Sequence, residues 1–412
     1  IAIATFLRIF NKRRRTVENK KAFLIFYLFG LVTFLIGFNW FIWGPILVPI
    51  VEPNFHVKPV LAELLITAVP LLLVVFSYFT GTLADRSPKR STAIAAILLG
   101  IFTLLRGIFS FNFVSLLIMN YLFALSASFA FTSWSPVTYR LFEKDKAAKI
   151  TAYFTAFLVS GQILAFFISF PLASCMGLKN FLTFSGVISL IVSILYLFVI
   201  RGWNDALKST EQHQRLSIFE GFRLVFSNRS LVVLCLIAFL DIGVFKWLAG
   251  WYPKLTLTFK GMSPSQSGYI NAFILVGCLI GAMTIPDFSH RIKKVKLFFI
   301  VLPIVVALML LTSFGINTFL GLSIISLIMG IALYPIYPLG LHLPSEFSDI
   351  GAEYAGVGSG IILIFSNLGG TIFPLLGSMS SGYAASITIF SILPMLLITL
   401  LGFIFKDPDT YS

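Results

Sequence analysis

Charged residues are scarce in this chain of 412 residues: Asp, Glu, Lys and Arg together make up 11%, whereas hydrophobic residues make up 58%. A water-soluble globular protein has about a quarter charged residues, so that class is excluded. The apolar residues form long runs rather than the short alternating segments of a membrane β-barrel. The composition therefore predicts an all-α protein that crosses a membrane many times.

Cysteine and histidine are also rare, with three and four copies. Cys175, Cys235 and Cys278 lie singly in apolar segments, which gives neither a disulfide framework nor a metal-ligand spacing. The histidines are scattered through predicted loops and helix ends, and the chain has no Ser, His and acid set and no phosphate-binding loop. We therefore expect no metal, no cofactor and no enzymatic activity.

Acidic residues are about half as frequent as basic ones, 16 against 30, which gives a net charge of +14. The cations are not spread over a soluble face, so a nucleic-acid partner is not expected. Most of them stand in connections that fall on one side of the membrane, which the positive-inside rule assigns to the cytoplasm. This asymmetry predicts contact with anionic membrane lipid.

Apolar windows of membrane-spanning length predict twelve helices. They are expected near residues 22–50, 61–80, 91–110, 113–137, 150–173, 180–200, 230–256, 266–286, 296–314, 316–343, 354–379 and 384–405. An even number of crossings places both chain ends in the cytoplasm. The predicted organisation is a cytoplasmic segment 1–21, a six-helix bundle 22–200, a cytoplasmic linker 201–229, a second bundle 230–406 and a cytoplasmic tail 407–412.

A charged stretch follows the second predicted helix: Gly81-Thr82-Leu83-Ala84-Asp85-Arg86-Ser87-Pro88-Lys89-Arg90. We expect a short turn there, in which Asp85 faces the N-terminal end of a helix or an arginine. Gly81 is expected to let two helices approach closely. The pattern G-x-L-A-D-R-x-x-K-R resembles the loop between helices 2 and 3 of the major facilitator superfamily, with Pro88 where that family usually has glycine.

The two halves of the chain look like repeats of one unit. The stretch Pro286 to Lys294 follows helix 8 as the charged stretch above follows helix 2. Arg86 and Arg291 are separated by 205 positions, and the same interval separates Gln162 from Asn367. The resemblance to the superfamily thus covers essentially the whole chain. It implies two six-helix pseudo-repeats with the substrate held between them near the middle of the membrane.

The resemblance also implies a gate on the cytoplasmic side. The segment from Tyr139 to Ala148 is similar to the charged loop between helices 4 and 5 of the superfamily, and it offers Arg140 and Glu143 as partners of Asp85. We expect these charges to lock the outward-facing state. The predicted gate residues are Gly81, Asp85, Arg86, Lys89, Arg90, Arg140, Glu143 and Arg291.

Ionisable residues within the predicted helices are the best functional candidates, because an uncompensated charge in hydrocarbon is costly. Asp241 lies about 15 Å into helix 7 and Lys246 follows five residues later, at roughly 140° around a regular helix. The two form either a structural pair or a functional one, in which Asp241 carries the coupling proton and Lys246 attracts an anionic group. Arg106, in the outer part of helix 3, is expected to extend toward the lipid headgroups.

Polar and aromatic residues complete the predicted substrate site. Asn39 and Trp43 share one face of helix 1, and Trp40 borders that face. The resemblance assigns helices 1, 4, 7 and 10 to the cavity wall, and prolines in helix 10 would permit it to bend. The predicted contacts are Asn39, Trp40, Trp43, Asn120, Gln162, Lys246, Trp247, Tyr334 and Tyr337.

Together these residues predict a monomeric transporter of the inner or plasma membrane that works by alternating access. A small zwitterion or carboxylate, moved together with protons, is the first expectation. Movement of an organic cation or amphiphile is the alternative, favoured if Lys246 is paired elsewhere and the tryptophans meet the ligand. A receptor or scaffold without transport is a third alternative, which the charges of Asp241 and Lys246 disfavour.

Overall fold

The computed structural model describes residues 17–142, 144–203, 218–347, 351–380 and 382–408, and all regular structure in these ranges is helical. Among the described residues, twelve helical stretches are long and apolar enough to cross a membrane. They are Lys20–Phe55, Pro59–Arg86, Pro88–Ile108, Phe113–Leu141, Ile150–Met176, Leu178–Ile200, Arg229–Lys260, Pro264–Ser289, Val295–Ser313, Phe319–Leu341, Val357–Gly377 and Tyr383–Ile404. The all-α fold with twelve spans is confirmed.

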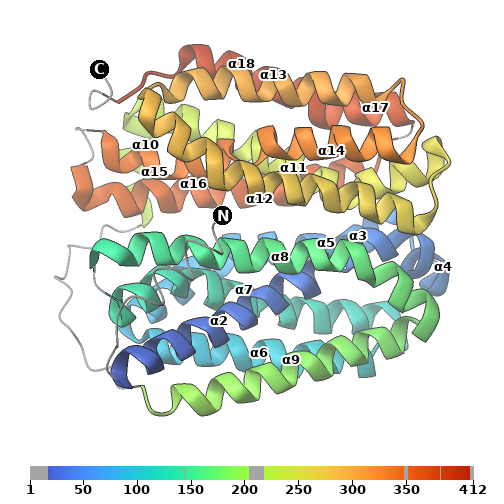
Figure 1. Ribbon diagram of the computed structural model, residues 1–412, viewed down its shortest axis with the longest axis horizontal. Coiled ribbons are helices and arrows are strands. Elements are labelled where there is room, and N and C mark those ends of the chain that lie inside the picture. Colours follow the sequence, from blue (N-terminus) through green and yellow to red (C-terminus); the bar gives the residue numbers. More distant parts are fainter. Residues whose placement is uncertain (1–16, 143, 204–217, 348–350, 381, 409–412) are drawn as a thin grey trace.

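The first half of the chain supplies spans 1 to 6 (Figure 1). Span 1 is divided into α2 (Val17–Phe41), α3 (Trp43–Ile46), the π-helix η1 (Leu47–Val51) and α4 (Glu52–Phe55). The next five spans are α5 (Pro59–Arg86), α6 (Pro88–Ile108), α7 (Phe113–Leu141), α8 (Lys144–Met176) and α9 (Leu178–Ile200).

The second half begins with a short helix, α10 (Ile218–Ser227), and continues with spans 7 to 9, which are α11 (Arg229–Lys260), α12 (Pro264–Ile292) and α13 (Val295–Ser313). Span 10 consists of α14 (Phe319–Leu333) and α15 (Ile336–His342), followed by the 3-10 helix η2 (Leu343–Glu346). Spans 11 and 12 are α16 (Gly351–Gly377) and the series α17 (Tyr383–Ile387), π-helix η3 (Thr388–Ile392) and α18 (Leu393–Ile404).

The same helix pairs form the main packing contacts in each half. In the first half α2 packs on α8, α5 on α7 and α6 on α9; in the second half α11 packs on α16, α12 on α14 and α13 on α18. Numbered within each half, these are spans 1 with 5, 2 with 4 and 3 with 6. The repeated pairing is what a duplicated six-helix unit produces.

A glycine at the crossing of spans 1 and 5 supports this pairing in both halves. A Cβ atom at Gly161 of α8 would overlap the carbonyl oxygen of Phe34, and a Cβ at Gly369 of α16 would overlap that of Phe239. Phe34 and Phe239 occupy matching positions 205 residues apart. Because helices in lipid associate through close backbone packing, these glycines fix the approach of the two pairs.

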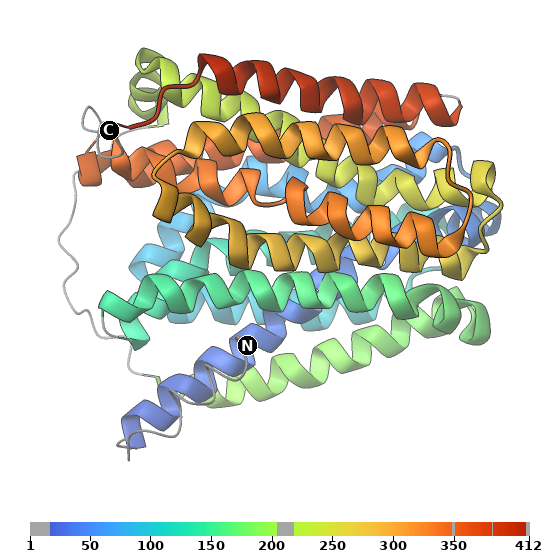
Figure 2. The ribbon, with the colours of Figure 1, turned by 45° about the horizontal axis from the view of Figure 1, so that its top comes forward.

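The two halves lie side by side with their helices nearly parallel, the first half below and the second above in Figure 1, and Figure 2 gives the same arrangement. The left end of Figure 1 holds α10 and α15. Cations gather at the helix ends on this side, where Lys89 donates to the carbonyl oxygen of Arg201 and Arg140 to that of Asp85. We call this end the basic end. The opposite end, which holds α4 and Lys179, is the far end.

The expected ten-residue turn at the charged stretch is wrong. Helix α5 continues through Arg86 and α6 begins at Pro88, so Ser87 alone connects them. The Ser87 hydroxyl caps α6, and proline is well accommodated in the first turn of a helix. The second stretch behaves similarly, because α12 runs to Ile292 with Pro286 inside it.

Candidate functional site

The ion pair and the ring contacts that join the two halves through described residues lie toward the far end. Lys254 Nζ of α11 lies 3.8 Å from Glu52 Oε1 of α4. The ring of Phe167 on α8 lies 5.5 Å from that of Tyr269 on α12. Pro45 and the backbone of Phe166 pack against α12 at Gly268. The two halves are therefore in contact toward the far end. We call this contact region, which includes Pro45, Glu52, Phe167, Lys254 and Tyr269, the seal.

Lys246 lies at the inner edge of the seal, where α11 meets span 1. It is 6% exposed. Its ammonium nitrogen lies 3.7 Å from the ring centre of Trp40 and 4.7 Å from the ring centres of both Phe41 and Phe245. The indole of Trp40 is held in place because its Nε1 donates to the carbonyl oxygen of Ile66 at 2.9 Å. Aromatic faces from both halves therefore surround this cation.

Asp241 is fully buried one and a half turns away on the same helix. Neither of its carboxyl oxygens has a hydrogen-bond partner, and among the described residues no ion pair links it to Lys246. Asp241 is close enough to Cys278, Tyr334 and Tyr337 to act on them electrostatically. In this conformation Asp241 and Lys246 therefore do not form the structural ion pair that was one of the two alternatives.

Tyr334 and Tyr337 come from the interruption of span 10. Helix α14 ends at Leu333 and α15 begins at Ile336, as expected where Pro335 removes a backbone donor. The ring of Tyr334 lies 5.4 Å from that of Phe245, beside Lys246. Residues from spans 1, 7 and 10 therefore converge at one depth. We call this group the central cluster: Trp40, Phe41, Asp241, Phe245, Lys246, Tyr334 and Tyr337.

Arg106 is fully buried, so the expectation that it extends to the headgroups is wrong. Its Nη1 donates to the backbone oxygen of Asn39 at 3.1 Å and to Asn120 Oδ1 at 3.0 Å, and its Nη2 donates to Asn39 Oδ1 at 2.6 Å. The guanidinium carbon lies 5.1 Å from the ring centre of Trp43. Amide oxygens and a ring face from spans 1 and 4 replace the water that a headgroup position would provide.

Three predicted substrate contacts belong to this interior network. The Asn39 amide group also bonds Ser185 and Ser189 of α9, at 3.2 and 3.1 Å. Trp43 Nε1 donates to Asn120 Oδ1 at 3.1 Å, and Asn120 Nδ2 donates to the Leu65 carbonyl at 2.9 Å. Their assignment as substrate contacts stays a prediction. The group is called the arginine network: Asn39, Trp43, Arg106, Asn120, Ser185 and Ser189.

Two further predicted contacts lie outside the central cluster. Trp247 is completely buried and stacks on Phe390 of η3 at 5.8 Å, so it faces the interior of the second half. Gln162 is buried on α8, with 2% of its surface exposed. That Trp247 and Gln162 contact the substrate stays a prediction.

At the basic end, Arg140 is brought to the end of α5 as predicted. Its Nη2 donates to the carbonyl oxygen of Asp85 at 2.8 Å and lies 3.5 Å from that of Arg86. A cation at this position satisfies carbonyls that the last turn leaves without partners. Glu143, the other proposed partner, lies outside the described residues.

The remaining predicted gate residues have different surroundings. Lys89 donates to the carbonyl oxygens of Arg201 and Trp203 at 3.0 and 2.7 Å, which ties the end of span 6 to α6. Arg90 and Arg291 are exposed. A Cβ at Gly81 would meet only Thr132, at an ordinary 3.8 Å, so this conformation does not require glycine there.

Glu63, which is 1% exposed in the second turn of α5, is absent from the residues predicted from the sequence. Its carboxyl group lies in the seal against Gly250 of α11. The available signal was a single carboxylate in an otherwise apolar segment. Because the predicted helix began at residue 61, the sequence places Glu63 at the membrane–water interface.

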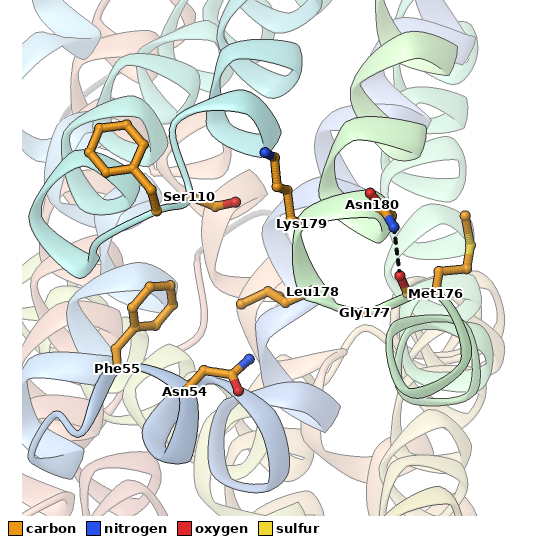
Figure 3. Close-up of a pocket in the computed structure, with 9 residues that line it drawn as sticks. Asn54, Phe55, Ser110, Met176, Gly177, Leu178, Lys179 and Asn180 are labelled. Atoms are coloured by element: carbon orange, nitrogen blue, oxygen red, sulfur yellow. Dashed lines mark hydrogen bonds between the residues drawn. The ribbon is translucent and has the colours of Figure 1, made fainter.

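A hollow of about 400 Å³ lies elsewhere, among the far-end turns of the first half (Figure 3). Its wall consists of Asn54, Phe55, Ser110, Phe111, Met176, Gly177, Leu178, Lys179 and Asn180. None of the predicted site residues lines it. Within the described ranges, no three His, Cys, Asp or Glu side chains are grouped so that they could hold a metal ion.

Comparison with known proteins identifies the family. The sequence profile of the Major Facilitator Superfamily matches residues 29–374. The chain belongs to this superfamily. The uncharacterised MFS-type transporter YceJ of Bacillus subtilis is 25% identical over 277 residues, which cover 66% of this chain and 68% of YceJ. An uncharacterised Archaeoglobus fulgidus protein is 24% identical over 186 residues, 44% of this chain and 81% of its own length.

Solved transporters of the superfamily have the same fold. A bacterial homologue of the human lysosomal transporter Spinster, in an inward-facing and unoccupied conformation, matches with a TM-score of 0.72 at 13% identity, over 95% of this chain and 96% of that one. The nucleoside transporter NupG matches with a TM-score of 0.66 at 14% identity, over 92% and 98%. The predicted family and fold are confirmed, and the protein is a membrane-embedded superfamily transporter.

Proposed function

We propose that this superfamily transporter moves a small organic solute with a carboxylate, such as an amino acid or an organic acid, by proton-coupled alternating access. The observation that carries the proposal is the state of Lys246. This cation is buried where the two halves meet, and only ring faces hold it among the described residues. A substrate anion would supply the partner that the protein does not.

The geometry around the ammonium group supports a carboxylate ligand. An ammonium group has three N–H donors, and none of the described residues accepts a hydrogen bond from Lys246. A charge-assisted bond to a carboxylate is among the stronger bonds available in a dry site. The face of Trp40 is already occupied by Lys246, which disfavours the alternative of an organic cation bound on that face.

Asp241 is the proposed proton carrier. A buried carboxyl group without hydrogen-bond partners is much more stable protonated than ionised. The free energy of the protein conformation that buries Asp241 therefore depends strongly on whether Asp241 carries a proton. Its position near Tyr334 and Tyr337 connects it to span 10, whose interruption permits movement. Proton binding at Asp241 and substrate binding at Lys246 would then act on the same cluster.

We infer that the conformation is inward-facing. The positive-inside rule assigns the basic end to the cytoplasm, and the halves are sealed at the far end. In the opposite state, the charges of the predicted gate would hold the basic end closed. Alternating access requires two states of similar energy, so a few charge-assisted bonds are enough to bias them.

The proposal is tested by uptake into vesicles that contain the purified protein, with labelled amino acids, organic acids and quaternary amines offered in turn under an imposed pH gradient. We expect a carboxylate solute to accumulate. Asp241→Asn should abolish accumulation but retain exchange of substrate across the membrane. Asp287→Asn, at an exposed carboxylate of the basic end, is the matched control. Undiminished accumulation by Asp241→Asn, or uptake of quaternary amines alone, would contradict the proposal.

A further inference from the structure

The far-end seal contains a carboxyl group that the proposed function does not use. Glu63 of α5 is fully buried, and its Oε2 atom has no hydrogen-bond partner. A Cβ atom at Gly250 would lie 3.2 Å from that oxygen and 3.5 Å from Oε1, so the carboxyl group packs directly on the backbone of α11. Because α5 and α11 belong to different halves, Glu63 is buried only while the seal is closed.

Two other charges lie beside Glu63. Lys254 follows Gly250 by one helical turn and so lies on the same face of α11. It is paired with Glu52 at 3.8 Å, and both side chains are partly exposed, by 23% and 18%. Glu63 interacts electrostatically with both of them. We call Glu52, Glu63 and Lys254 the seal cluster.

The other elements packed on α5 bring no further described charge to Glu63. His56 and Lys58, in the turn before α5, are exposed. Arg106 of α6 is bound to Asn39 and Asn120. On α7 the nearest titratable side chain is the half-buried Tyr121, and residues 357–377 of α16 contain no titratable group. On α11, Lys246 precedes Gly250 by one turn, and its ammonium group lies on the rings of Trp40 and Phe41. The electrostatic partners of Glu63 are Lys254 and Glu52, so these three residues set the charge of the cluster.

The charges of the seal cluster do not balance without a proton. Two carboxylates and one ammonium group carry a net charge of −1, and one bound proton makes the group neutral. One oxygen of each carboxyl group lacks a hydrogen-bond partner, but Glu52 lies 3.8 Å from Lys254 and is 18% exposed, whereas Glu63 is fully buried. Burial of an unpaired carboxylate is strongly unfavourable. The extra proton therefore belongs on Glu63.

We propose that Glu63 is a second proton site of this transporter: it holds a proton while the far end is sealed and releases it to the far-side water when the halves separate there. This proposal rests on the proposed function as a proton-coupled transporter. The bond that forms is the O–H bond of the Glu63 carboxylic acid, and on opening the proton passes to water and leaves a hydrated carboxylate.

The sign of the pH effect follows from the extra proton. The sealed state binds one more proton than the open state, so low pH favours the sealed far end and rising pH opens it. Linkage to one proton changes the ratio of the two populations by up to about tenfold per pH unit. Proton uptake from the far side would thus close the far end behind the substrate.

The experiment measures the distance across the far end by electron-spin resonance in lipid nanodiscs. Spin labels are placed at Phe111→Cys and Met379→Cys, which are 70% and 75% exposed and lie on different halves. Cys175 is replaced by alanine, and the buried Cys235 and Cys278 are kept. As the pH rises from about 5.5 to about 8.5, we expect a larger fraction of the molecules that keep Glu63 to show the longer distance between the two spin labels.

In Glu63→Gln, which carries no charge at any pH, the short distance should dominate throughout that range. Glu63→Asp, which keeps a carboxyl group, is the variant for the case that glutamine disturbs folding, and it should keep the response. Asp287→Asn, the control at an exposed carboxylate, should also keep it. In Lys254→Gln both carboxyl groups must be protonated for sealing, so the midpoint should move to lower pH.

A pH response in Glu63→Gln equal to that of the parent, or no response in the parent, would overturn the proposal. Failure of the proposed function is separable from this outcome. If no carboxylate solute accumulates in vesicles but the distance still responds to pH through Glu63, the substrate assignment fails and the seal site stands. If solute accumulates and Glu63→Gln leaves the distance response intact, only the seal site fails.

Discussion

Among the residues that the structure describes, each half buries one cation at depth, and the two cations are held in different ways. Arg106 in the first half donates three hydrogen bonds to amide and backbone oxygens of Asn39 and Asn120. Lys246 in the second half is held by aromatic rings, two of which belong to the other half. One charge is satisfied inside a single bundle, and the other lies across the boundary between bundles.

Under the proposed function, this difference separates a structural charge, Arg106, from a substrate-binding one, Lys246. Polar groups buried within one half keep their partners in every state in which that half moves as a body. A charge at the boundary must exchange its surroundings when the halves rock, so bonds that would fix it permanently are a disadvantage. Ring faces stabilise Lys246 without using its N–H donors, which leaves them for a ligand.

The largest effect is expected from Arg106→Met. The substitution removes three hydrogen bonds, after which Asn39 Oδ1 keeps only the Ser185 hydroxyl and Asn120 Oδ1 only the Trp43 indole as a donor. A hydrogen bond to a charged group contributes about 1.5–3 kcal/mol. Thermal unfolding of the purified protein in detergent should show a large drop in the midpoint. Lys246→Met, measured alongside, should change the midpoint little, and equal losses in the two variants would break the comparison.

Lys246→Met should instead impair substrate binding. Loss of a charge-assisted bond to the substrate is worth about 1.5–3 kcal/mol, which corresponds to roughly tenfold to a hundredfold in affinity. Titration of the purified variant with the transported carboxylate, followed by ligand-induced thermal stabilisation, measures this loss. Lys246→Arg, which keeps the charge, should retain part of the affinity. Unchanged affinity in Lys246→Met would remove the functional role of this cation.

Trp40→Phe should have the smallest effect. The variant keeps an aromatic face for Lys246 but loses the indole, which is the preferred partner of a cation, and the bond to the Ile66 carbonyl. Weakening by about 1 kcal/mol corresponds to roughly fivefold lower affinity. The same titration detects it. A larger loss than in Lys246→Met would mean that Trp40 contacts the substrate itself.

The number of spans, the duplication and the family followed from the sequence because each depends on signals that repeat along the chain. Apolar runs of spanning length mark every helix, and the interval of 205 positions links Arg86 with Arg291. The predicted helix boundaries at the basic end were less accurate. Charged residues can continue a helix into the headgroup region, as α5 does to Arg86, so a charged stretch is not by itself a turn.

The partners of buried charges could not be predicted, because they lie far away in the sequence. Arg106 binds Asn39, which precedes it by 67 positions, and its own segment gives no sign of that contact. Lys246 and Trp40 were both selected as candidates, but their contact depends on how the two halves dock. Glu63 was missed for the same reason, since its burial is created by Gly250 of the other half.

The interruption of span 10 at Tyr334 and Pro335 has a mechanical consequence. On its far-end side, α14 is interlocked with α12, because a Cβ at Gly330 would overlap the carbonyl oxygen of Ile274. On the basic-end side, α15 is a separate short rod that carries Tyr337. A swing of this rod about the proline would move Tyr337 of the central cluster while the packing of α14 on α12 stays intact. Under the proposed alternating-access mechanism, occlusion of the substrate would therefore begin within one half, before the two halves rotate as bodies.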